Sequence, residues 1–157
     1  MNKEPKLVSL TGWQKDVVAI IDSHATLRES QEYQAMPDYV INKELSLSVA
    51  FPRQSGHTTF ANYLASKYAS IVVYRDIKHY LALSQPLQLH QNTDMLSMFE
   101  ISYVLTESVQ PSLNVEDLKQ RFHGKKVVVV DGGESLPARV RSFLLEVATC
   151  QVVFLGK

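Results

Sequence analysis

The chain has little of what marks secreted, membrane-spanning or nucleic-acid-binding proteins. One cysteine, Cys150, excludes an intramolecular disulfide and a cysteine metal cluster. No apolar run approaches the roughly 20 residues of a membrane helix, and the N-terminal stretch lacks the apolar core of a signal peptide. The 16 basic and 16 acidic residues cancel, which removes the basic balance of an autonomous DNA-binding domain. We therefore expect a cytoplasmic protein with a buried thiol and no membrane partner.

The rest of the composition is that of an ordinary globular domain. Of the 157 residues, 45% are hydrophobic and 20% are charged, which is enough to build one hydrophobic core. No internal repeat or low-complexity tract divides the chain. We therefore predict a single domain over residues 1–157, with a loose N-terminus over residues 1–9 and no nuclease domain.

Helical and strand patterns alternate along the chain, and this alternation predicts an α/β fold. A mostly parallel sheet with helices on both faces follows from it. The stretch 25–43 is interpreted as a long connection that can contain a short helical piece. A helix is favoured over 93–107, although the alternation of Phe99, Ile101, Tyr103 and Leu105 also fits a strand. The predicted strands cover 45–51, 70–74, 125–131 and 151–155, and the predicted helices cover 11–24, 58–67, 76–83, 114–122 and a segment beginning near Pro137.

The stretch from Leu45 to Ala65 has the layout of a phosphate-binding loop. An apolar strand leads into the polar loop Pro52-Arg53-Gln54-Ser55-Gly56, and a helical pattern follows. Backbone N–H groups in such a loop, together with the N-terminus of the following helix, attract an anion. The alternative is a plain strand–turn–helix connection capped by a threonine. We predict nucleotide binding by residues 52–59.

Individual loop residues fit this chemistry to different degrees. Gly56 allows the backbone to approach a phosphate closely. Thr58 stands where a hydroxyl binds Mg²⁺, and Thr59 can cap the helix or donate a hydrogen bond. The nucleotide-binding pattern has lysine where this chain has His57, and its first glycine falls at Phe51. Replacing that lysine contact should cost about 1.5–3 kcal/mol, or about ten- to a hundredfold in affinity.

A second motif, Val127 to Asp131, is an apolar strand that ends in an acid. Phosphoryl-transfer enzymes of the P-loop type hold Mg²⁺ with such an aspartate. The catalytic base is expected at the next position, which is Gly132, so Glu134 is the nearest carboxylate that could polarise a water. Asp131 also suits the start of a turn, and a helix dipole alone would favour Glu134.

In order along the chain, these motifs resemble the ATPase domain of viral DNA-packaging terminase large subunits, which are P-loop NTPases. The similar stretches are Trp13-Gln14, PRQSGHTT at 52–59, VVVVDGGESLP at 127–137 and QVVFLGK at 151–157. The resemblance implies that Gln14 reads adenine beside Trp13, and that Arg53 meets the γ-phosphate. It also implies Mg²⁺ bound with ATP through Thr58 and Asp131. A three-layer P-loop fold is expected.

Departures from the family pattern leave two functional hypotheses. His57 and Gly132 replace catalytic residues, and no coupling serine or threonine follows Phe154. The first hypothesis is an ATP-binding protein with weak or absent ATPase activity, which binds ATP, ADP or phosphate. The second is a catalytically inactive pseudo-ATPase that binds a protein partner in phage DNA packaging or replication. Nucleic-acid binding through Arg139, Arg141 and Lys125-Lys126 is a weaker third option.

Overall fold

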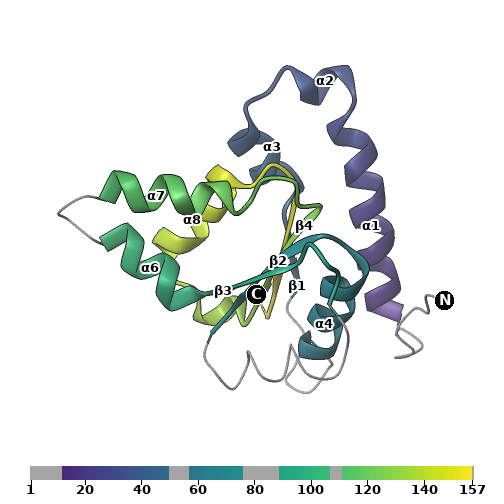
Figure 1. The fold of residues 1–157 in the computed structure, drawn as a ribbon. Helices are drawn as coiled ribbons and strands as arrows, with labels where there is room; N and C mark the ends of the chain where they lie inside the picture. Colours follow the sequence, from purple (N-terminus) through teal and green to yellow (C-terminus); the bar gives the residue numbers. More distant parts are fainter. Residues whose placement is uncertain (1–11, 50–56, 76–88, 107–110, 157) are drawn as a thin grey trace.

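A five-stranded, all-parallel sheet forms the centre of the protein (Figure 1). The computed structural model describes residues 12–49, 57–75, 89–106 and 111–156, without the side chains of residues 57, 58, 106 and 111–114. The strand order is β1-β5-β4-β2-β3. The strands are β1 (Leu47–Val49), β2 (Ser70–Tyr74), β3 (Asp94–Ser97), β4 (Val127–Asp131) and β5 (Gln151–Leu155).

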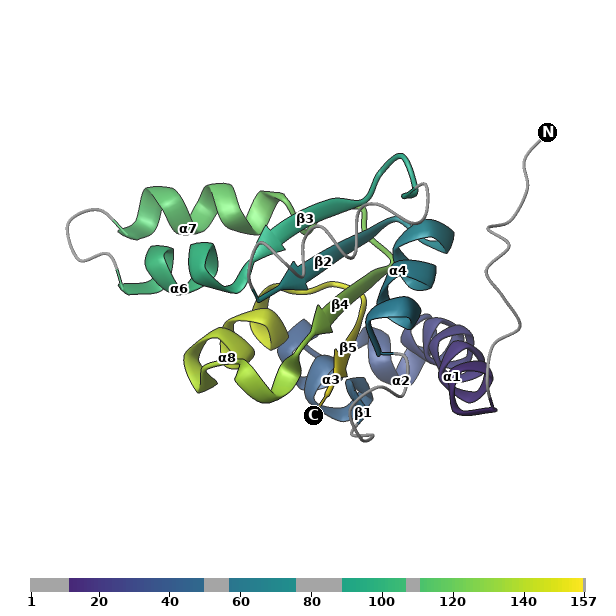
Figure 2. The ribbon, with the colours of Figure 1, turned by 90° about the horizontal axis from the view of Figure 1, so that it is seen from below.

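Helices cover both faces of this sheet (Figure 2). Side chains alternate along each strand, so Val127 and Val129 of β4 pack with α1 and α4, whereas Val128 and Val130 pack with α6, α7 and α8. This confirms the predicted α/β class with a parallel sheet. The helices are α1 (Gly12–Arg28), α2 (Gln31–Gln34), α3 (Asp38–Leu45), α4 (His57–Lys67), α6 (Met98–Thr106), α7 (Pro111–Gln120) and α8 (Ala138–Val147), with a 3₁₀ turn η1 (Gly133–Ser135).

The connections between strands explain why β5 lies between β1 and β4. The chain leaves β1, runs through α4 on one face and enters β2, which lies beyond β5 and β4. After β3 it returns on the other face, through α6 and α7 to β4 and through α8 to β5. The connections after β1 and β4 therefore leave on opposite faces. In open parallel sheets, ligands bind at the carboxyl ends of strands where the connections diverge in this way.

Several predicted elements agree with the structure, including β2 and β5 with their predicted bounds and α4 to within one residue. Pro137 directly precedes α8. The predicted strand 45–51 is shorter, because Leu45 belongs to α3. The predicted helix over 76–83 lies outside the described residues. Among the described residues, no helix combines the length and apolarity that crossing a bilayer requires.

Two other predictions were wrong in part. The stretch 25–43 contains more helix than the expected short piece, because α1 continues to Arg28 and two further short helices follow it. The predicted helix 93–107 is confirmed over 98–106, where α6 lies, but residues 94–97 form β3, since they pair in register with 71–74 of β2. Sheet pairing thus prevails over the local helical pattern. The helix predicted from Asn114 begins three residues earlier, at Pro111.

A buried polar cluster ties α1 and α3 to the end of α8. Asn42 is fully buried and donates through Nδ2 to the carbonyls of Leu145, at 2.7 Å, and Ala148, at 2.6 Å. Its Oδ1 accepts a 2.5 Å hydrogen bond from Arg28, which also donates to the Cys150 carbonyl at 2.9 Å. Burial lowers the pKa of Arg28. One fully buried amide therefore makes three hydrogen bonds, of which the one to the Ala148 carbonyl is itself buried.

Replacing Asn42 with alanine is expected to lower the free energy of unfolding by about 2–4 kcal/mol, because two carbonyls and a guanidinium lose their partner. Urea denaturation measures the change. Asn92→Ala is the matched control: its side chain is exposed, so the expected cost is below about 0.5 kcal/mol. Equal costs for both variants would contradict the bonding pattern.

An ion pair holds α7 to β3 across the edge of the sheet. The Arg121 guanidinium donates to both carboxylate oxygens of Asp94, at 2.8 and 3.1 Å, and to the Met95 carbonyl at 3.0 Å. The hydrogen bonds from Arg121 lower the pKa of Asp94, and the same pair raises the pKa of Arg121. The pair therefore stabilises the folded state when Asp94 is ionised.

Asp94→Asn is expected to destabilise the protein at pH 7 by an amount that shrinks as the solution is acidified. Because the folded pKa of Asp94 is lowered, its stabilisation is present above the unfolded pKa of about 3.9 and is lost as pH falls through the folded pKa. Unfolding curves at pH 7 and pH 3 measure the two differences from wild type. Asp16→Asn, an exposed acid on α1, is the control, and a difference for Asp94→Asn that is no smaller at pH 3 than at pH 7 would refute the assignment.

Candidate functional site

Three parallel strands bring distant parts of the chain into one row at the carboxyl edge of the sheet. Val49 of β1 lies opposite Leu155 of β5, which in turn lies opposite Asp131 of β4. Hydrogen bonds continue beyond the strands, from Gly156 N to Val49 O at 2.7 Å and from Gly132 N to Leu155 O at 3.0 Å. Two strand spacings separate Val49 from Asp131, which is about 10 Å.

This row faces α4. Val49 and Leu155 belong to the cluster that packs against Phe60 and Ala61 of α4, and Asp131 follows Val127 and Val129 in the alternation of β4. Its side chain is 3% exposed. The chain passes from Val49 through residues 50–56 to α4, which begins at His57. The N-terminus of α4, which carries the positive end of its dipole, thus opens at the edge where Asp131 lies.

Glu134 brings a second carboxylate to this edge. It lies in η1, directly after the left-handed turn at Gly132, and its side chain is exposed. Gly156, at φ +94°, follows β5, and a Cβ at that position would clash with Glu134 Oε1. The carboxylate of Glu134 therefore lies against the end of β5, between the ends of β4 and β1. We call Asp131, Glu134, Gly156 and the start of α4 the carboxyl-edge site.

The structure adds one cation that the sequence reasoning missed. Arg75 directly follows β2, the strand beside β4, and its Nη1 lies 3.4 Å from Ser135 Oγ in η1. It is exposed and lies at the same edge of the sheet as Asp131. The criterion that selected Asp131, a polar residue directly after a buried apolar strand, would also have selected Arg75.

Trp13 lies near the start of α4, and Gln14 follows it in α1. The Trp13 ring packs edge-to-face on Phe60, with ring centroids 5.1 Å apart, and Gln14 is 7% exposed. Trp13 therefore helps to anchor α1 against α4. Because Phe60 is in the first turn of α4, Trp13 is held on the side where the predicted loop enters the helix.

The structure leaves most of the predicted loop unassigned. Five of its residues lie outside the described residues: Pro52, Arg53, Gln54, Ser55 and Gly56. For His57 and Thr58, the backbone begins α4, and their side chains lie outside the description. Thr59 is exposed in the first turn of α4. The described part of the site therefore consists of the groups around the loop.

The basic residues proposed for nucleic acid do not form one patch. Lys125 and Lys126 precede β4, at the amino edge of the sheet, where Lys126 lies 5.2 Å above the Tyr68 ring. Arg139 and Arg141 lie in the first turn of α8, beyond the opposite edge. They bond to the Leu105 carbonyl and to Ser48 Oγ respectively. Each pair has its own local packing role.

The donor set at the edge fits Mg²⁺ only in company with a phosphate. No cluster of three or more His, Cys, Asp or Glu side chains suited to a metal occurs in the described part of the chain. Mg²⁺ typically takes one or two carboxylates and fills its octahedron with phosphate oxygens and water. Buried Asp131 can supply one such carboxylate. Cys150 is unsuited to ligation or redox chemistry because burial raises its pKa to about 12.

Comparison with known proteins adds no relative. No protein-family model, curated protein or solved structure matches the chain. The functional reading of the carboxyl-edge site therefore depends on its geometry and on its residues.

The backbone at Gly132 explains why glutamate does not follow Asp131 here. Gly132 has φ +87° and ψ +40°, a left-handed conformation. Gly132→Ala or Gly132→Glu is expected to cost about 1–2 kcal/mol of stability, and Gly132→Asn less, because asparagine tolerates this region. Steric overlap adds little, since a Cβ would meet only Met98 Cε, at 3.9 Å.

Thermal or urea unfolding of the three Gly132 variants measures these costs. Gly12→Ala is the control, because Gly12 lies in α1 and no atom of the described residues would lie within 4 Å of a Cβ there, so alanine should be neutral or stabilising. If Gly132→Ala lowers the free energy of unfolding no more than Gly12→Ala does, the left-handed turn at Gly132 would be contradicted.

Proposed function

We propose that the chain is a P-loop-type nucleotide-binding protein that binds Mg-ATP at the carboxyl-edge site and hydrolyses it weakly or not at all. One observation carries the proposal: Asp131 is buried in the same row as the end of β1 and faces the helix that follows the loop. The two sequence motifs therefore belong to one edge of one sheet.

Each group has a role in the proposed complex. The loop 52–56 and the N-terminus of α4 would hold the phosphates through backbone N–H groups. Asp131 and Thr58 would hold Mg²⁺, which bridges phosphate oxygens and neutralises their charge. Arg53, with Arg75 nearby, would supply positive charge, and Glu134 is the carboxylate nearest to a catalytic base. Gln14 and Trp13 would lie toward the base.

Weak hydrolysis follows from the two substituted positions. His57 cannot supply the permanent, long-reaching cation of a lysine. The left-handed turn at Gly132 removes the position from which a base would follow Asp131. Charge that develops on the transferred phosphoryl group would therefore be poorly stabilised. The resemblance to terminase ATPase domains makes a cytoplasmic role in phage DNA packaging part of this proposal.

A second candidate is a pseudo-ATPase that acts as an interaction module. The observation that favours it concerns residues outside the nucleotide site: Phe99 and Tyr103 on α6 are 74% and 59% exposed. Exposed aromatic side chains next to each other on one helix are typical of interaction surfaces. This function would require the fold but no nucleotide.

Calorimetric titration with ATP, in Mg²⁺ and in EDTA, tests the nucleotide proposal. Wild type should bind one ATP, and Asp131→Asn should weaken binding about tenfold in Mg²⁺ and little in EDTA. Asp16→Asn, an exposed acid on α1, is the matched control and should bind as wild type does. His57→Lys should raise affinity about ten- to a hundredfold and increase phosphate release.

Circular dichroism checks that the buried Asp131 variant folds, and Thr58→Ala provides a second Mg²⁺-directed variant. Absence of binding heat at millimolar Mg-ATP in both wild type and His57→Lys would refute the nucleotide proposal. An ATP affinity that changes neither on removal of Mg²⁺ nor on substitution of Asp131 would refute the assignment of the metal site.

A further inference from the structure

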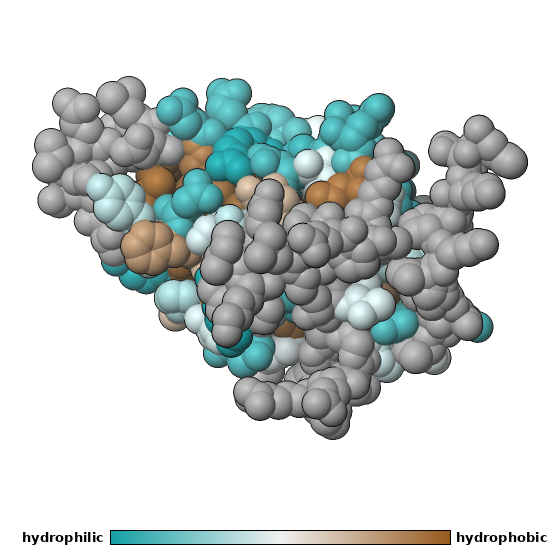
Figure 3. Space-filling view, turned by 60° about the horizontal axis from the view of Figure 1, so that its bottom comes forward, coloured by the Kyte–Doolittle hydropathy of each residue, from teal (hydrophilic) through white to brown (hydrophobic). Residues whose placement is uncertain are grey.

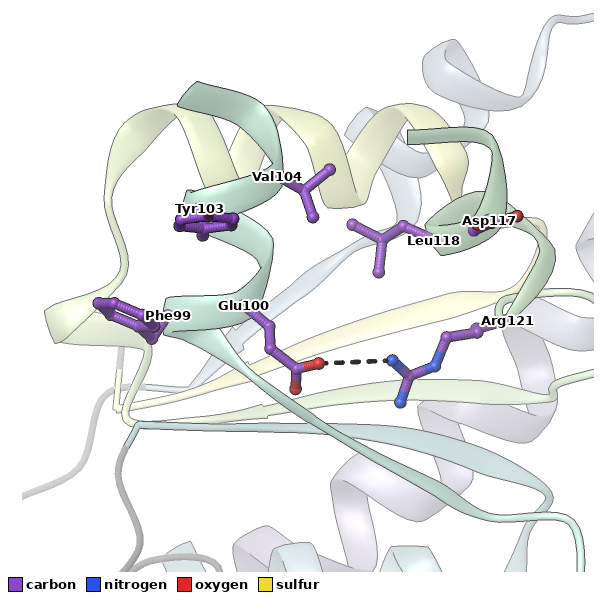
Figure 4. A pocket seen from close by; sticks show the side chains of 7 residues that line it. All are labelled: Phe99, Glu100, Tyr103, Val104, Asp117, Leu118 and Arg121. Carbon is purple, nitrogen blue, oxygen red and sulfur yellow. Dashed lines mark ion pairs between the residues drawn. The ribbon is translucent and has the colours of Figure 1, made fainter. Parts of the chain in front are cut away.

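A groove runs between α6 and α7, on the face of the sheet opposite α4 (Figure 4). It has a volume of about 450 Å³. Val104 of α6 and Leu118 of α7 point toward each other and form its floor, and Leu118 is 5% exposed. Figure 3 shows hydrophobic surface bordered by hydrophilic atoms at the end of the molecule where these helices lie. We call this feature the α6–α7 groove.

The rim on α6 is aromatic and open to water. Phe99 and Tyr103 are one helical turn apart and therefore share one side of α6, with 74% and 59% of their surfaces exposed. Both rings project beyond the floor of the groove (Figure 4). Aromatic side chains provide most of the binding energy at many protein interfaces. The rim thus offers apolar area that the fold itself leaves uncovered.

The lining of the groove carries more negative than positive charge. Arg121, its cation, is engaged by Asp94 and the Met95 carbonyl and lies 3.8 Å from Glu100. The exposed carboxylate of Asp117 has no ion-pair partner among the described residues. Since the lining holds two carboxylates, Glu100 and Asp117, and one guanidinium that Asp94 already engages, the groove favours a cationic partner.

The shape of the groove favours a helix over a small molecule. Pockets for small ligands are concave and enclose most of the ligand's surface, whereas Phe99 and Tyr103 at this rim are largely exposed to water. A helix lying between α6 and α7 would cover the rings with its apolar face. This is the helix-in-groove mode of recognition, in which anchors spaced by one turn fill an apolar channel.

We infer that the α6–α7 groove binds an amphipathic helix of a partner protein. The apolar face of the partner helix packs on Phe99, Tyr103 and the floor of the groove. A lysine or arginine bordering that face pairs with Asp117 and Glu100. This interaction surface shares no residue with the carboxyl-edge site, so the inference does not rest on the proposed nucleotide binding.

Labelled model peptides of about 16 residues test the inference by fluorescence anisotropy. One peptide has a leucine face bordered by lysines, a second has glutamates in those places, and a third has a central proline. The lysine-bordered helix should bind at least about tenfold more tightly than either of the others. Amide NMR shifts on binding should fall on residues 98–105 and 115–121.

Variants of the full chain locate the binding surface. Phe99→Ala and Tyr103→Ala should each weaken binding about tenfold or more. Tyr39→Ala, another exposed aromatic on α3, should leave binding unchanged. Asp117→Asn should reduce the preference for lysine over glutamate several-fold, with Asp16→Asn as its control. Thermal unfolding of the two aromatic variants should match wild type, since both side chains are exposed.

Four results of the binding experiments would overturn the inference. The first is no binding by the lysine-bordered helix at millimolar concentration, and the second is equal affinity of that helix for wild type and for Phe99→Ala. The third is an affinity for hexylamine, a small apolar amine, that equals the affinity for the helix. The fourth is NMR shifts confined to the carboxyl-edge site. A wild-type dimer that Phe99→Ala converts to monomer in analytical ultracentrifugation would instead assign the groove to a second copy of the chain, and would equally overturn it.

Discussion

The pairing of β5 with both β1 and β4 is the constraint on which the rest of the structure depends. Each of these contacts is parallel and fully buried on the β5 side, and each continues past the strand ends through the amides of Gly132 and Gly156. Without β5 in this place, Val49 and Asp131 would not share a row. The site is therefore a property of strand order, to which the loop residues add their chemistry.

The alternation of side chains in β4 makes this arrangement possible. Four consecutive valines bury both faces of the strand, so the next residue, Asp131, must face one layer of helices. It faces α4, whose N-terminus offers a positive dipole. A carboxylate on the opposite face would lie among α6 and α8, remote from the loop. The alternation of side chains along β4 thus decides whether Asp131 faces the carboxyl-edge site.

Sequence patterns were sufficient wherever one element is recognised from its own residues. The runs at 70–74 and 151–155 have strand bounds that match the structure, because both faces of these strands are buried and the apolar run is continuous. Residues 94–97 were mistaken for helix because only their pairing with β2 makes them a strand. Arg75 was missed for a similar reason: its relation to η1 appears only when β2 lies beside β4. What the sequence could not supply was strand order.

The two proposed sites are neighbours in space although they share no residue. α6 begins directly after β3, at the same carboxyl edge as Asp131, and β3 lies two strands, or about 10 Å, from β4. The first residue of α6, Met98, is buried, and Met98 Cε lies 3.9 Å from the position that a Cβ on residue 132 would occupy. Contact alone does not couple two sites, since coupling requires an element with two arrangements. A shift of α6 on binding a partner helix would reach the turn after Asp131 through Met98. In that case, the nucleotide and the partner helix would change each other's affinity by the same factor.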